Sequence, residues 1–107
     1  MRWLCLVLLL IASACKRTAP DVAATEAGMQ LRIAERQWDL RDKNGLDPVG
    51  DTLRAVYEQQ PKNPEVLWQL ARLRVFEGLV EPDRRAALDK FAWGRSLALD
   101  CLDAEPA

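Results

Sequence analysis

The sequence predicts an all-α domain of about four helices that pack as antiparallel pairs. Apolar residues recur three and four positions apart through most of the chain, which is the period of amphipathic helices. Pro, Gly and Asn divide the chain at short intervals, and no segment alternates apolar with polar residues as a strand does. Because the connections between helices are short, consecutive helices are expected to lie antiparallel.

Two helices are expected in the first half of this domain. Residues 26–43 contain no proline and place their apolar side chains on one helical face. Asn44 and Gly45 are typical of a helix C-terminus. Residues 46–50 are predicted to form a turn, and a second helix is expected over 51–60, with its first or second residue as the N-cap.

Two further helices are expected in the second half. Asn63 is a good N-cap and Pro64 suits the first helical position, so the third helix is predicted over 64–77 with Gly78 as its stop. Its apolar side chains cover more than one stripe, so we expect it to be packed on more than one side. A fourth helix is predicted from about residue 84 to residue 99.

The N-terminal segment has three parts in a fixed order. Arg2 precedes an uncharged apolar core at residues 4–12, and the small residues Ser13 and Ala14 precede Cys15. A spanning helix needs roughly 20 apolar residues, so this core is too short to cross a bilayer. A positive flank, a short apolar core and small residues are the features of a cleaved signal.

This arrangement resembles the signal of bacterial lipoproteins, in which the residue after the cut is a cysteine that carries a diacylglycerol. The resemblance implies that residues 1–14 are a signal peptide and that Cys15 is lipidated. Residues 15–25 would then form a flexible tether, and residues 26–107 the helical domain. Several acyl chains hold a protein at a bilayer almost permanently, so the expected partner of the N-terminus is a membrane.

The lipoprotein resemblance has one departure and three competing interpretations. Ala12 stands where leucine is commonest in that family. The segment could instead be an ordinary signal peptide cut near Ala14, an uncleaved short anchor, or an apolar N-terminus that belongs to a core. By resemblance to enteric sorting signals, Lys16 rather than Asp after the cysteine implies the outer membrane, with the domain facing the periplasm.

Composition excludes several function classes. Fifteen Lys and Arg against 16 Asp and Glu give a net charge of −1 with no basic stripe, so no nucleic acid partner is expected. The chain has no His, which removes the commonest general base and metal ligand, and we expect no catalysis, no metal and no cofactor. If Cys5 leaves with the signal and Cys15 carries lipid, Cys101 has no partner for an internal disulfide.

The stretch 61–78 resembles a tetratricopeptide repeat at its most recognisable boundary. Leu67, Leu70 and Ala71 match the large and small apolar positions of that family, and Gly78 matches the glycine before its turn. The resemblance implies a helical-repeat solenoid, which is an α-solenoid of stacked antiparallel pairs.

The next helix fits this repeat less closely. Trp93 fits the aromatic place, whereas Asp89 stands where a small apolar residue is usual and Cys101 replaces the usual proline. The linkers 60–65 and 100–105 look alike, since each follows an apolar helix and precedes an acidic helix start. The number of residues between the starts of these two linkers falls within the range of helical-repeat periods. We therefore expect the second linker to mark the end of the repeat.

The repeat resemblance also implies a binding face. In tetratricopeptide stacks the first helix of each pair lines the concave face, and four residues spaced three and four apart in the third helix would line it. These residues are Glu65, Trp68, Arg72 and Val75. Trp and Arg are enriched in binding hot spots. The alternative is that Trp68 is core and Arg72 a solvated charge, and Trp38 and Trp93 are expected in the core.

The leading hypothesis is therefore a non-catalytic, lipid-anchored scaffold in the bacterial envelope that binds a protein or peptide. A second hypothesis follows from residues 83–100, which resemble the lengthened repeat of envelope lipoproteins akin to the T-component of tripartite periplasmic transporters. That resemblance implies a small-molecule-binding accessory of a solute transporter. A third is a truncated product without independent function, because stacked repeats need neighbours to bury their faces.

Overall fold

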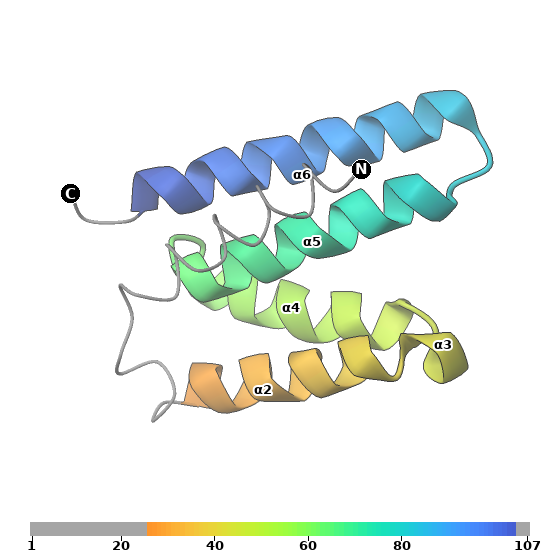
Figure 1. The fold of residues 1–107 in the computed structure, drawn as a ribbon. Helices are drawn as coiled ribbons and strands as arrows, with labels where there is room; N and C mark the ends of the chain where they lie inside the picture. The colour runs from red at the N-terminus through yellow and green to blue at the C-terminus, as the bar shows by residue number, and fades with distance from the viewer. Residues whose placement is uncertain (1–25, 105–107) are drawn as a thin grey trace.

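The computed structural model describes residues 26–104 of the chain, and these residues form an all-α domain (Figure 1). No strand occurs within them, and 87% of them are helical. The helices are α2 (Glu26–Asp39), α3 (Arg41–Asn44), α4 (Asp47–Gln59), α5 (Pro64–Val80) and α6 (Arg84–Ala104). The all-α prediction is confirmed.

The four long helices form antiparallel pairs, as expected. In Figure 1 they lie in the order α2, α4, α5 and α6, and each runs opposite to the one before it. Helix α5 packs most extensively against α6, while α2 packs against α4 and α4 against α5. Helices α2 and α5 are therefore the first members of the two pairs. None of the helices within residues 26–104 has the length and apolar character needed to cross a membrane.

The first predicted helix is divided in two by the structure. Helix α2 ends at Asp39, and the single turn α3 follows it after Leu40. The predicted stop is confirmed, because Gly45 has a φ of 77° and its N–H donates to the Arg41 carbonyl at 2.8 Å. A positive φ suits glycine because it has no side chain to clash there.

The predicted turn at 46–50 is wrong. Helix α4 begins at Asp47, and Pro48 lies in its first turn, where its missing N–H needs no partner in the helix. The N–H of Gly50 already donates to the Leu46 carbonyl at 3.0 Å, so these residues are helical. Helix α4 ends at Gln59, one residue before the predicted end.

The predicted start of α5 is confirmed, but its predicted end at residue 77 is wrong. Asn63 caps the helix, because its Oδ1 accepts from the Glu65 N–H at 2.9 Å, and Pro64 takes the first helical position. The helix passes through Gly78 and ends at Val80. A Cβ at Gly78 would lie 2.7 Å from the ring of Phe91, so this glycine lets α6 approach closely rather than ending α5.

Helix α6 also runs beyond its predicted end and includes residues 100–104. The predicted linker at 100–105 is therefore wrong. Cys101 continues the buried side of α6 one turn after Leu97, is fully buried, and has its Sγ 3.4 Å from the Pro64 carbonyl oxygen. No glycine or proline occurs between Leu97 and Ala104, so burial extends α6 over the start of α5.

The core lies around α5, which is buried on several sides as predicted. Its buried hydrophobic residues are Leu31, Ala34, Val49, Leu53, Val56, Val66, Leu67, Trp68, Leu70, Ala71, Leu73, Leu97 and Cys101. The expectation for Trp38 holds in part, since it is half-buried against this core. The expectation for Trp93 is wrong, because its side chain is 49% exposed on α6.

Candidate functional site

Three of the four predicted binding residues are connected on α5. The carboxylate Oε2 of Glu65 accepts a hydrogen bond from Trp68 Nε1 at 2.6 Å. One turn further on, the guanidinium carbon of Arg72 lies 4.8 Å from the centre of the Trp68 ring. The spacing of three and four residues therefore places these side chains in a row along one side of the helix.

Helix α2 supplies two partners that the sequence interpretation did not assign to this face. Arg72 donates from Nη1 and Nη2 to the two carboxylate oxygens of Glu35, both at 2.9 Å. The Arg72 guanidinium also lies 4.3 Å from the ring centre of Trp38. The guanidinium is thus held by two indole rings and one bidentate carboxylate, which fixes its orientation.

The row continues into α3. The guanidinium of Arg41 lies 4.3 Å from the Trp38 ring and 5.0 Å from that of Phe76, and it donates from Nη1 to the Trp38 carbonyl at 2.9 Å. Trp38 and Phe76 meet edge to face with their ring centres 5.3 Å apart. The alternating row Arg41, Trp38, Arg72 and Trp68 is called the arginine–tryptophan ladder below. It joins the two first helices, α2 and α5, directly and extends to α3 at one end.

Only part of the ladder is open to solvent. The side chains of Arg72 and Glu35 are 25% and 39% exposed, whereas Trp68 is buried. The Nε donors of Arg41 and Arg72 are covered and have no acceptor among the described residues. The accessible groups of this face are therefore a partly exposed ion pair over the buried Trp68 ring and the half-buried Trp38 ring.

Val75, the fourth predicted residue, lies at the packing between α5 and α6. A Cβ built at Gly94 of α6 would come within 2.9 Å of Val75 Cγ2. Val75 follows Arg72 by three residues, as predicted for a shared helix face. However, α6 approaches α5 closely here, so the Val75 side chain packs against α6. The structure therefore brings Glu65, Trp68 and Arg72 together with α2 and places Val75 against α6.

A second charged and aromatic cluster joins α5 to α6. Arg74 is buried, its Nη1 lies 2.6 Å from a Glu77 oxygen, and its guanidinium lies 3.9 Å from the Trp93 ring. Lys90 reaches the other oxygen of Glu77 at 3.8 Å. This cluster explains why Trp93 is exposed on one side, since the indole covers Arg74 rather than entering the core.

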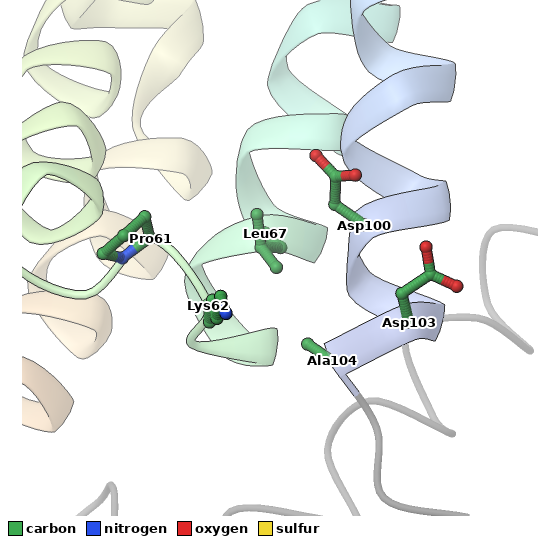
Figure 2. A pocket seen from close by; sticks show the side chains of 6 residues that line it. All are labelled: Pro61, Lys62, Leu67, Asp100, Asp103 and Ala104. Carbon is green, nitrogen blue, oxygen red and sulfur yellow. The ribbon is translucent and has the colours of Figure 1, made fainter.

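A pocket of about 390 Å³ lies where the turn between α4 and α5 meets the end of α6 (Figure 2). It is lined by Pro61, Lys62, Leu67, Asp100, Asp103 and Ala104. Figure 2 shows the two carboxylates on α6, one turn apart. The described residues contain no group of three or more side chains that could hold a metal ion.

Cys101 is disulfide-bonded in the structure of the full chain. No internal disulfide partner was expected for it from the sequence. That expectation concerned a processed chain whose Cys15 carries lipid, and Cys15 lies outside the described residues, as do the predicted signal peptide and tether.

The helices and the ladder define the class of this protein as a small all-helical domain of antiparallel helix pairs. No family model matches the chain, and neither the curated proteins nor the solved structures include a match to it.

Proposed function

We propose that this protein is a non-catalytic binding scaffold and that it captures a protein or peptide on the face between α2 and α5. The observation that carries the proposal is the guanidinium of Arg72, which lies between the rings of Trp38 and Trp68 and faces the Glu35 carboxylate. Tryptophan and arginine are the residues that most often dominate binding at interfaces.

The exposed ion pair supports this proposal. The Arg72–Glu35 pair is partly exposed, so the carboxylate of a ligand can reach the Arg72 guanidinium and compete with Glu35 for it. The Arg72 side chain is already held between two rings, so little conformational entropy is lost when a ligand binds it. We therefore expect the captured segment to carry an acidic side chain or a free C-terminal carboxylate.

The same face agrees with the tetratricopeptide-like arrangement that the sequence implies. Helices α2 and α5 are the first members of their pairs, and such helices line the concave face in that family. The proposal accordingly describes a tetratricopeptide-like scaffold. Its partner is a protein or peptide, and it needs no cofactor.

Exchanging the charges of Glu35 and Arg72 is expected to weaken partner binding at least tenfold while the domain stays folded. The double variant Glu35→Arg with Arg72→Glu keeps an ion pair between α2 and α5 but moves the guanidinium away from the two rings. A photo-crosslinking residue at position 35 of the full chain, in membranes, would identify the partner. Titration of that purified partner against both chains would measure affinity.

Arg54 provides the control for this experiment, because it is exposed on α4, away from the ladder. A crosslinker at position 54 should give no product with the same partner, and Arg54→Glu should leave affinity unchanged. Equal affinity of the charge-exchanged and unchanged chains would contradict binding at the ladder.

We further propose that the domain is anchored by lipid at Cys15 and faces the periplasm from the outer membrane. The support is the order Arg2, apolar core, Ser13-Ala14 and Cys15 in the sequence. A helical domain of this size would then be tethered to the bilayer surface rather than embedded in it.

Cys15→Ser is expected to abolish incorporation of labelled palmitate by cells that express the full chain. Removal of the acceptor thiol leaves no site for the diacylglycerol, so labelling should fall to background. Cys5→Ser is the matched control and should label like the unchanged chain. If Cys15→Ser and the unchanged chain label equally, the anchor is not at Cys15.

A further inference from the structure

Helix α6 has a second stripe on the side that faces away from α5, and it is apolar except for Arg95. The exposed residues Leu88, Ala92, Arg95, Leu99 and Leu102 follow one another at spacings of four, three, four and three. Leu88, Leu99 and Leu102 are 57%, 49% and 42% exposed. The buried residues Gly94, Leu97 and Cys101 lie on the other side. The alternating spacing of three and four residues along the exposed stripe is typical of a helix that packs lengthwise against a second helix.

The charges of α6 run against its dipole. The Asp83 carboxylate before α6 accepts from the Ala86 N–H at 2.9 Å. Within the helix, Arg84 and Arg85 occupy the first turn, which contains no acidic residue, and Asp100 and Asp103 lie near the end, where no basic residue occurs. The N-terminal end of a helix is positive and the C-terminal end negative, so both groups are unfavourable in an isolated helix. An adjacent helix with the opposite charge distribution would compensate both ends.

We propose that the outer stripe of α6 binds the same stripe of a second copy of this chain, with the two α6 helices antiparallel. An antiparallel copy brings the basic start of one helix beside the acidic end of the other. Arg85 and Asp103 are 18 residues apart, which is five turns, so both project from the same side of α6. In this pairing Arg85 meets Asp103 of the second copy at each end of the interface.

The apolar residues fit a closely related register. When Leu88 lies opposite Leu99 of the second copy, Ala92 lies opposite Arg95 and Arg85 lies opposite Leu102. Asp103 is the next residue, about 1.5 Å further along the helix, so the long Arg85 side chain can reach its carboxylate. The pairing is two-fold symmetric, so every contact occurs twice and the interface closes without leaving a free stripe. It also leaves the arginine–tryptophan ladder uncovered, because α6 lies at the opposite edge of the helix array from α2 (Figure 1).

The exposed stripe of α2 lacks this charge complementarity. Met29, Ile33 and Leu40 are exposed at similar spacing on α2. However, α2 has Glu26 in its first turn and Arg36 in its last turn, as its dipole favours. The charges therefore select α6 rather than α2 for pairing between copies.

Sedimentation equilibrium of the full chain in a non-ionic detergent tests the proposal. Arg85→Glu and Asp103→Lys, each alone, are expected to raise the dissociation constant of the dimer about tenfold, because each places like charges together at both ends. The double variant should return it to within about threefold of the original value. Each single change suits the helix dipole, so loss of the dimer could not be attributed to a weakened α6.

Two further variants separate the possible interfaces. Leu99→Glu should dissociate the dimer, because it places a carboxylate in the apolar stripe, whereas Arg54→Glu on the exposed side of α4 should not. A chain that stays monomeric at all concentrations would overturn the proposal. So would a double variant that fails to recover, or a dimer that dissociates with Ile33→Glu and not with Leu99→Glu. None of these outcomes depends on whether the ladder binds a partner.

Discussion

Leu73→Ala is expected to lower the free energy of unfolding by about 3 kcal/mol. Leu73 is 1% exposed on α5, and a Cβ at Gly50 of α4 would lie 3.7 Å from its Cδ2. The alanine would leave a cavity between α4 and α5 that neither helix can close without losing other contacts. Urea unfolding of the full chain in a non-ionic detergent, followed by far-ultraviolet circular dichroism, measures the change.

Leu79→Ala is the matched control for this substitution. Leu79 lies in the same helix but is 61% exposed, so the same chemical change should alter stability by about 0.5 kcal/mol or less. If the two variants lost equal stability, α5 would not be packed as described.

Gly94→Leu is expected to destabilise the domain by about 3 kcal/mol or more. A Cβ at Gly94 would lie 2.9 Å from Val75 Cγ2 and 3.2 Å from the Ala71 carbonyl oxygen. The valine side chain can rotate, but the carbonyl belongs to the backbone of α5, so the two helices would have to separate. The loss should appear as a lower midpoint in thermal unfolding and a lower free energy in urea.

Ser96→Leu is the control for added bulk on the same helix. Ser96 is exposed on α6 and is not packed against α5, so a leucine there should change stability little. A Gly94→Leu variant as stable as Ser96→Leu would show that α5 and α6 are not in close contact at this point.

The sequence was sufficient to predict the helical class and those boundaries that depend on local chemistry. Asn63 and Gly45 act through their own backbone or cap geometry, and both were placed correctly. The boundaries that failed depend on tertiary packing. Gly78 lies inside α5 and leaves room for the ring of Phe91, and Cys101 lies inside α6, where it is buried beside Pro64. No local pattern distinguishes a glycine that ends a helix from one that admits a neighbour.

The candidate site could be predicted only on one of its two sides. The spacing of Glu65, Trp68 and Arg72 indicates a shared face of α5, and the structure shows them connected. Glu35 lies 37 positions before Arg72, so its role depends on how α2 is placed through α4. The only sequence signal for the second side was that Glu35 and Trp38 lie three residues apart in the first helix. Helical spacing alone would place the glutamate in solvent and the tryptophan in the core.

The stacking of two indoles on one guanidinium makes the ladder an optical reporter of its own occupancy. The emission of Trp38 and Trp68 depends on their distance from Arg72, at 4.3 and 4.8 Å in this arrangement. Trp93 lies on α6 beside Arg74, outside the ladder. The described residues therefore carry tryptophans at two separate surfaces, and a chain in which Trp3 and Trp93 are replaced by Phe would report on the ladder alone without an attached dye.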